Sequence, residues 1–420
     1  ASDGDIISIE TGVYADVSIA KRLSFTIVNS GSQDTISVTD FRITANDTVT
    51  FSRGDNDANR FVVTDSVILG SAKDSKARLI LSDNTFKINN GQDLVLKGDS
   101  TTVSGTFVYP GSFSLTYLVE RPFTTGDELP ASLGSGVLSI TADSSFTIDK
   151  DIAVGGLSIN NASSAATHIN GGRTITLGNT VSVSNTAIND RFTNNIVFAG
   201  DKDFDFTIND TLYGSVSFAS DAENTVSLKT TADTAMITGD VTVSSDATLS
   251  LKMKSPYPLE LNDANFTVNG TVTSDTTSIL YFTGSSASTV FAPGASTNRY
   301  GGIKVKKTGS GEVTVNNSVT FVAEGYVDTA MSIIDGTLDF GSNSAIFTGD
   351  SAIVKNSAGT GAFVAGGVRF INADDNARPK LIGLGFPSIT VDLTGNSGTR
   401  DLYVSDASDS TTYSGALRIV

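Results

Sequence analysis

The residues best suited to chemistry are three aspartates at alternate positions of the stretch GDKDFDF, residues 200–206. In a β-strand, Asp201, Asp203 and Asp205 would line one face at intervals of about 7 Å. Carboxylates that are this close repel one another unless solvent or a cation lies between them. The simplest interpretation is a solvated acidic face. The same three side chains are also our candidate calcium site, because Ca²⁺ binds several oxygen ligands.

Paired carboxylates can also cleave sugars, so a polysaccharide-degrading enzyme is one alternative. Such enzymes present aromatic platforms, whereas this chain has no Trp and only 10 Tyr. His168 is the only histidine, and cysteine is absent, which excludes a histidine metal cluster, thiolate metal sites and a cysteine nucleophile. His168 stands in a polar turn, SAATHINGG, without a nucleophile motif nearby. The sequence therefore predicts no catalytic residue and no enzymatic activity.

The remaining polar motifs fit ordinary turns. The tripeptide Arg-Gly-Asp at residues 53–55 matches an integrin-binding motif, but it also forms a Gly-Asp-Asn turn. Asp57 follows this turn, and the pair Asp374–Asp375 lies in a similar loop. None of these aspartates has the spacing of an EF-hand. We expect turns there, with weak calcium binding as an alternative.

The composition indicates a folded, turn-rich, acidic protein. Hydrophobic residues make up 39% of the 420 residues, which is enough for a large core, and glycine contributes 40. The formal net charge is −17, and a surface this acidic disfavours nucleic acid and anionic membranes. The one compact basic cluster is KVKK, residues 304–307. No run approaches the roughly 18 apolar residues of a membrane span, so we predict no membrane insertion.

Short strands with one apolar face recur along most of the chain. In ATLSLKMK, residues 247–254, Ala247, Leu249, Leu251 and Met253 would share one face and polar residues the other. Helical patterns are almost absent. These features predict an all-β fold.

The spacing of the strands suggests two domains and a linker. Residues 1–122 contain strands about ten residues apart with Gly and Asx turns, which predicts an immunoglobulin-like β-sandwich closed by a hairpin over residues 106–120. Residues 123–136 contain a proline and three glycines with little apolar periodicity, which predicts a linker. Residues 137–420 have shorter strands and more uniform turns, which predicts a β-helix, with tandem β-sandwiches as the alternative.

The texture of segments such as GTLDFGSNSAIFTGD and TGDVTVSSDATLSL resembles secreted prokaryotic surface proteins. These include S-layer subunits, extracellular filament subunits and the β-helical passenger domains of autotransporters. The resemblance implies an extracellular, cell-surface location and a structural role. The chain also begins ASDGDIISIE without Met, which fits a mature secreted product.

The two ends carry apolar strands. Ile6, Ile7 and Ile9 are close to the start of the chain, and Leu417, Ile419 and Val420 finish it. An exposed strand edge can pair with another chain. We therefore expect these six residues to mediate self-assembly and copies of the same chain to be the partner. The alternative is an adhesin or fibre, cellular or phage-borne, that presents a β-helix to a cell-surface glycan or host. The one cofactor that the sequence suggests is calcium.

Overall fold

The computed structural model describes the chain in segments between residues 6 and 419. These are residues 6–9, 12–14, 17–19, 23–27, 35–38, 41–43, 48–53, 60–63, 67–69, 78–88, 93–97, 102–109, 111–119, 122–142, 144–160, 168–182, 191–199, 204–208, 211–219, 225–230, 235–253, 258–275, 277–291, 299–309, 311–322, 329–348, 352–358, 362–371, 380–383, 385–386, 388–392, 403–404 and 417–419. The chain divides into two compact units, residues 1–195 and 196–420.

Each unit is a parallel β-helix. The residues that the structure describes form strands and turns without any helix, and every strand pairing described within a unit is parallel. Strands that are neighbours in a sheet come from successive coils. For example, Leu115 aligns with Leu138, and Leu138 aligns with Leu157. The predicted all-β class and the predicted β-helix are therefore confirmed.

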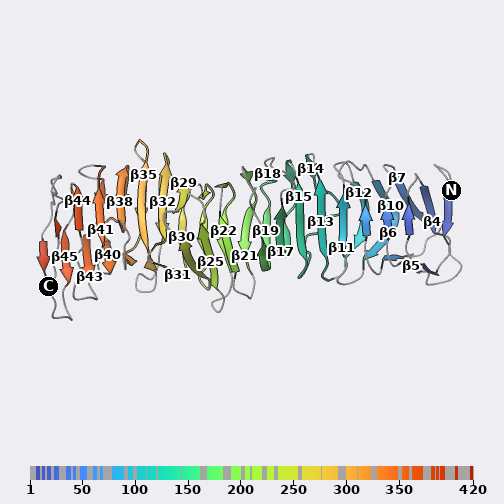
Figure 1. Ribbon diagram of the computed structural model, residues 1–420, viewed down its shortest axis with the longest axis horizontal. Helices are drawn as coiled ribbons and strands as arrows, with labels where there is room; N and C mark the ends of the chain where they lie inside the picture. Colours follow the sequence, from blue (N-terminus) through green and yellow to red (C-terminus); the bar gives the residue numbers. More distant parts are fainter. Residues whose placement is uncertain are drawn as a thin grey trace. The chain divides into compact units, whose positions relative to one another are not determined.

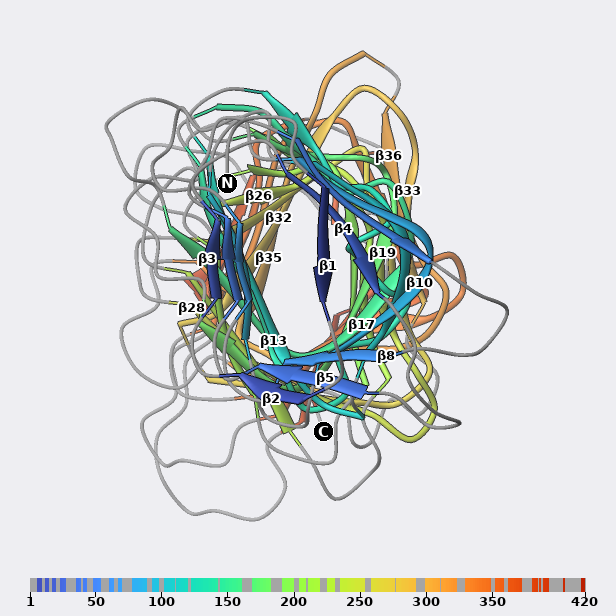
Figure 2. The same ribbon diagram turned by 90° about the vertical axis from the view of Figure 1, so that its right-hand side faces the viewer.

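In unit 1 the strands form three sheets (Figure 1). The first sheet contains β1 (Ile6–Ile9), β4 (Leu23–Ile27), β7 (Thr48–Arg53), β10 (Arg78–Ile88), β8 (Arg60–Val63), β5 (Thr35–Val38) and β2 (Gly12–Tyr14), with β12 (Thr102–Val108) also paired to β10. The second contains β3 (Val17–Ile19), β6 (Phe41–Ile43), β9 (Val67–Leu69), β11 (Asp93–Lys97), β13 (Ser114–Val119), β15 (Val137–Ala142), β17 (Ile152–Asn160) and β19 (Thr174–Ser182). The third contains β14 (Phe123–Thr124), β16 (Phe146–Thr147), β18 (His168–Asn170) and β20 (Arg191–Phe192). Viewed along the coils, β2, β3 and β4 lie on different sides of the interior (Figure 2).

In unit 2 the strands form four sheets. We name the two with the most strands sheet B and sheet C. Sheet B contains β21 (Asn195–Phe198), β24 (Val216–Phe218), β27 (Val241–Val243), β30 (Phe266–Val268), β33 (Ser288–Phe291), β36 (Glu312–Val315), β39 (Thr337–Asp339) and β42 (Phe363–Val364). Sheet C contains β23 (Thr211–Leu212), β26 (Met236–Ile237), β29 (Leu259–Asn262), β32 (Ile279–Gly284), β35 (Gly302–Lys307), β38 (Met331–Asp335), β41 (Ile353–Asn356), β44 (Lys380–Gly383) and β46 (Tyr403–Val404). The others are β22 (Phe204–Ile208), β25 (Thr225–Thr230), β28 (Thr248–Met253) and β31 (Thr271–Ser274), and then β34 (Arg299–Tyr300), β37 (Val319–Val322), β40 (Ser344–Thr348), β43 (Gly367–Ile371), β45 (Ile389–Asp392) and β47 (Leu417–Ile419).

The core consists of the inward side chains of successive coils. In β28, Leu249, Leu251 and Met253 are buried while Lys252 is exposed, as the period of two predicts. Because strands of successive coils lie about 4.8 Å apart in register, equivalent side chains stack on one another. The rings of Phe321, Phe347 and Phe370 form such a stack, with centroids 5.2 and 5.5 Å apart.

The immunoglobulin-like sandwich expected for residues 1–122 is not shown. Neighbouring strands of an immunoglobulin sandwich run antiparallel, whereas the described strands here pair in parallel. The expected closing hairpin over residues 106–120 is also not found, because β12 pairs with β10 while β13 pairs with β11 and β15. Alternation with a period of two shows which side chains share a face, but not whether the partner strand runs parallel or antiparallel.

The predicted linker, residues 123–136, contributes to a coil of unit 1. It contains β14, which pairs with β16, and it buries Thr125, Glu128, Leu129 and Leu133. Its proline and glycines therefore lie in a packed coil.

Candidate functional site: strand edges and buried polar clusters

The structure places little of the predicted aspartate site. Asp201 and Asp203 lie outside the described residues, and of Asp205 only the backbone is described, in β22 aligned with Ser227. Within the described part of the chain, no group of three or more His, Asp or Glu residues could hold a metal ion. Calcium binding at these aspartates stays a prediction.

The other polar motifs are also only partly placed. His168 begins β18 and aligns with Arg191, but its side chain is outside the described residues. Arg53 ends β7, and the rest of its tripeptide lies outside the described residues, as do Asp57 and the pair Asp374–Asp375.

The candidate assembly residues lie in strands with one described neighbour. Ile6, Ile7 and Ile9 belong to β1, which pairs with β4, and Leu417 and Ile419 belong to β47, which pairs with β45. Val420 is outside the described residues. In the described topology, β1, β2 and β3 of unit 1 and β42, β46 and β47 of unit 2 each stand at the end of a sheet order. One edge of each of these six strands therefore has no described partner.

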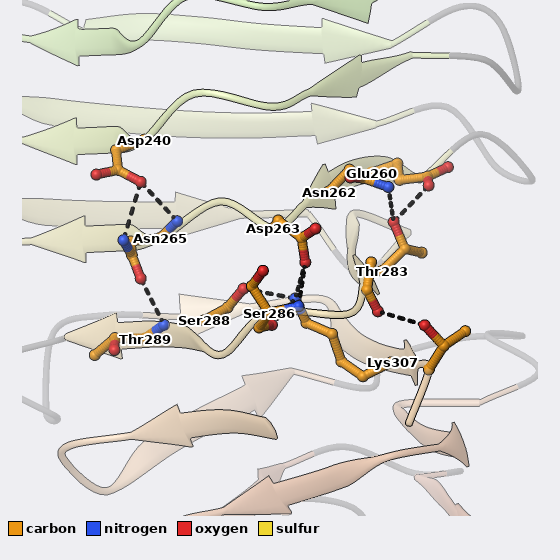
Figure 3. Close-up of polar contacts among 12 residues, drawn as sticks. Asp240, Glu260, Asn262, Asp263, Asn265, Thr283, Ser286, Ser288, Thr289 and Lys307 are labelled. Atoms are coloured by element: carbon orange, nitrogen blue, oxygen red, sulfur yellow. Dashed lines mark hydrogen bonds and ion pairs between the residues drawn. The ribbon is translucent and has the colours of Figure 1, made fainter. Parts of the chain in front are cut away.

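A buried lysine in unit 2 was missed by the sequence analysis. Lys307, at the end of β35, is 0% exposed, and its ammonium group lies 3.3 Å from a carboxylate oxygen of Asp263. It also donates hydrogen bonds of 2.8 Å to the Ser286 carbonyl and to the Ser288 hydroxyl (Figure 3). We call Asp263, Ser286, Ser288 and Lys307 the Lys307 network. Its members come from three successive coils, so it joins these coils at one corner.

The surroundings of the Lys307 network shift the pKa values of Lys307 and Asp263. Burial lowers the pKa of Lys307, and the neighbouring Asp263 opposes this effect. For Asp263, partial burial raises the pKa, but hydrogen bonds from the Ser286 amide and from Lys307 outweigh it, so the net pKa is lowered. The exposed fraction of the Asp263 side chain is 35%, so water reaches the carboxylate but not the ammonium group.

Glycines make room for the Lys307 side chain. A Cβ atom on Gly311 or Gly336 would lie 2.8 or 2.6 Å from the Cβ of Lys307. Asp263 is the one described non-glycine residue with positive φ, at 54°. A Cβ atom on Gly284, which has a φ of 92°, would lie 2.1 Å from an Asp263 carboxylate oxygen. The glycines at this corner therefore leave the space that the Lys307–Asp263 ion pair occupies.

Two smaller networks extend across the same region (Figure 3). Asp240 accepts hydrogen bonds of 3.0 Å from the backbone and side-chain amides of Asn265, whose own oxygen accepts one from the Thr289 amide. Thr283 donates to Glu260 at 2.6 Å and accepts from Asn262 at 3.1 Å. Each network links side chains of neighbouring coils. Since Lys307 is fully buried and has three partners, the arrangement favours stabilisation over reaction with a substrate.

Unit 1 contains a buried glutamate. Glu128 is 2% exposed, and its carboxylate accepts hydrogen bonds from the Tyr117 hydroxyl at 2.8 Å and from the Gly126 amide at 2.9 Å. The Tyr109 hydroxyl donates to the Glu128 carbonyl. Burial raises the pKa of Glu128, and the charge of Asp149 adds to this effect. Both hydrogen bonds are accepted by the same carboxylate oxygen, Oε1.

The interior of unit 2 contains a small apolar cavity of about 10 Å³, lined by residues that include Leu280, Phe282, Tyr300 and Phe321. This volume holds at most about one water molecule. The Tyr300 hydroxyl has no hydrogen-bond partner among the described residues, and burial raises its pKa far above the ordinary value. The cavity is too small for a substrate.

The sequence did contain a signal for Lys307. In GIKVKK, residues 302–307, a period of two places Lys307 on the same face as the buried Ile303 and Val305. No comparable signal exists for Glu128, because its segment has no apolar periodicity. Its partner Tyr117 lies 11 residues earlier, in β13.

Within the described residues, no helix is both long and apolar enough to cross a membrane. No protein-family model, curated protein or solved structure matches the chain.

Proposed function

We propose that this protein is a non-enzymatic structural subunit that self-assembles into an extracellular filament or surface layer. The observation that carries the proposal is the arrangement of the end strands: β1, β2 and β3 of unit 1 and β42, β46 and β47 of unit 2 each have one edge without a described partner. In a parallel β-helix such an edge is a row of backbone N–H and C=O groups that can pair with another strand. The mechanism is strand pairing and end-to-end packing between copies.

The polar clusters support a structural role. Lys307 and Glu128 are both buried, and their partners belong to the same unit. Groups of this kind stabilise the coils and are not accessible to a substrate. A net charge of −17 would oppose the approach of two copies until salt, calcium or a neighbour compensates it.

Electron microscopy of the purified protein, with calcium and with a chelator, tests the proposal. We expect ordered filaments or sheets. Two fusion proteins then locate the contact: a folded globular domain joined directly to residue 1 or to residue 420 should block that end and leave discrete particles.

The matched control carries the same domain on a flexible Gly/Ser linker of about 30 residues, which leaves the end of the chain accessible. This control should assemble like the unmodified protein. Discrete particles of unmodified protein at every concentration would contradict the proposal and favour the adhesin alternative. Assembly by the directly fused proteins would exclude end-to-end pairing.

A further inference from the structure

The outer face of sheet C carries a concentration of lysines. Lys306, Lys355 and Lys380 are exposed, and Lys304 is half-buried. Lys304 and Lys355 lie in one outward column, because each aligns with Ser332 of the intervening strand β38. With about 4.8 Å between strands, these two lysines are about 10 Å apart. The Lys304 ammonium group lies 4.6 Å from the ring centroid of Tyr281, which aligns with it on the neighbouring strand β32.

A β-bulge places an apolar side chain among these lysines. Val305 aligns with Ile333 and Lys306 with Asp335, so Ile334 is the extra residue between them. Ile334 is 39% exposed and is one of three large hydrophobic residues that the structure describes as exposed. Bulges re-aim side chains and are often found where a protein makes contacts. We call Lys304, Lys306, Ile334, Lys355 and Lys380 the basic face.

The basic face contrasts with the charge of the whole chain, which has 28 Lys and Arg against 45 Asp and Glu. Charges further apart than about 8 Å are screened at physiological ionic strength, so a local patch can attract an acidic surface despite a net repulsion. Protein interfaces combine a buried apolar core with a polar, solvent-accessible rim. A polyanion such as an acidic glycan gains little from Ile334, whereas an apolar side chain of a protein partner can pack against it. The patch therefore fits an acidic protein surface.

We propose that the basic face binds the acidic surface of a second copy of this chain and so joins neighbouring copies side by side. The strongly acidic surface of the chain supplies the complementary charge, and every copy carries both parts of the interface. The inference extends the proposed self-assembly by naming a lateral contact, distinct from the end strands. Because the attraction is between charges of opposite sign, this contact weakens as salt increases.

Sedimentation velocity tests the contact in protein whose two ends are blocked by directly fused domains, so that end pairing does not contribute. We expect self-association at roughly 0.03 M NaCl that is at least about tenfold weaker at roughly 0.3 M. The triple variant Lys304→Glu/Lys306→Glu/Lys355→Glu should weaken association by about tenfold or more, and so should Ile334→Asp alone.

Two controls carry a Lys→Glu and an apolar→Asp substitution elsewhere in unit 2. Lys252→Glu alters an exposed lysine of β28, and Tyr213→Asp alters the tyrosine that follows β23 and is 41% exposed. Both controls should associate like the parent. Circular dichroism and thermal melting show whether each variant is folded. If Ile334→Asp fails to fold, Ile334→Ser replaces it.

If the basic-face variants associate as strongly as the controls, the inference is overturned. It is also overturned if the parent does not associate. If the basic-face variants lose binding to polygalacturonate while their self-association is unchanged, the basic face binds an acidic glycan. This outcome also overturns the inference. The outcomes separate the two proposals. Lateral association without filaments in the unblocked protein would refute end pairing alone. Filaments of the unblocked protein without any association of the end-blocked protein would refute the lateral contact alone.

Discussion

Lys307 is the residue whose burial most needs an explanation, because a cation rarely leaves water without compensation. Here three acceptors surround the ammonium group: the Asp263 carboxylate, the Ser286 carbonyl and the Ser288 hydroxyl. The Ser288 hydroxyl is fully buried and would lose its donor if the charge were removed. An unsatisfied buried acceptor costs about 1–3 kcal/mol.

We therefore predict that Lys307→Met lowers the free energy of unfolding by about 2 kcal/mol. Urea denaturation measures this change. The neighbouring Lys306→Met is the control, because an exposed substitution usually changes stability by less than about 0.5 kcal/mol. Equal effects of both substitutions would show that the Lys307 network does not stabilise the corner.

The two buried tyrosines should respond in opposite ways to loss of the hydroxyl group. The Tyr300 hydroxyl has no described partner, so Tyr300→Phe should raise the free energy of unfolding by about 1 kcal/mol. The Tyr117 hydroxyl donates to Glu128, so Tyr117→Phe should lower it by about 2 kcal/mol. Thermal unfolding of the two variants gives the comparison, and a destabilised Tyr300→Phe would refute the idea of an unsatisfied group.

Glu128 should make stability depend on pH. Its folded-state pKa lies above the ordinary value of 4.5, so the folded chain binds the proton more tightly than the unfolded chain. The stability that this group contributes is fully present below pH 4.5 and is lost as the pH rises through the folded-state pKa. Glu128→Gln keeps the acceptor oxygen but cannot ionise.

The variant should therefore gain stability relative to the parent between about pH 4 and about pH 7, by about 1.4 kcal/mol for each unit of pKa difference. Denaturation at both pH values measures this gain. Asp127→Asn, which removes an exposed carboxylate one residue away, is the matched control. A constant difference between Glu128→Gln and the parent would mean that Glu128 titrates normally.

At the scale of the elements, the corners between strands depend on glycine. Gly336 has a φ of 81°, and a Cβ atom there would lie 2.6 Å from the Cβ of Lys307 and 2.8 Å from the Gly311 carbonyl. Gly309 also has a positive φ, of 67°, but nothing lies within 4 Å of the added Cβ. Substitutions at Gly309 and Gly336 therefore separate the effect of backbone strain from the effect of steric crowding.

We expect Gly309→Ala to lower the free energy of unfolding by about 1 kcal/mol, the cost of the strained backbone alone. Gly336→Ala should cost about 2–3 kcal/mol, because the neighbouring coil must also move. Chemical denaturation of both variants provides the measurement. Equal losses would show that the corner can absorb the extra methyl group.

For the whole molecule, the net charge governs how easily copies meet. At pH 7 the formal charge is −17, and the isoelectric point is near 4.4. Lowering the pH from about 7 toward 5 protonates carboxylates and reduces the repulsion between copies.

The concentration needed for end-to-end assembly should therefore fall as the pH decreases over this interval, as measured by pelleting and by electron microscopy of the pellet. Added salt at pH 7 should have the same effect on end-to-end assembly by screening, whereas it should weaken the lateral contact through the basic face. Assembly that becomes weaker as the pH approaches 5 would contradict this account.

The sequence by itself determined the fold class and much of the chemistry that is excluded. The alternation in segments such as residues 247–254 predicted strands with one buried face, and Leu249, Leu251 and Met253 are indeed buried. A single histidine and the lack of cysteine exclude a histidine metal cluster and thiolate chemistry whatever the fold. These conclusions depend only on residue type and local spacing.

Only the tertiary structure decided which strands pair and which polar residues meet. A period of two gives the face of each side chain but neither the direction nor the partner of the strand, so residues 1–122 fitted a sandwich as well as a stack of parallel coils. Lys307 and Asp263 are 44 residues apart, and Ile334 is exposed because of one extra residue in β38. Both features depend on the length of each coil and on the register that this length sets, which local patterns do not contain.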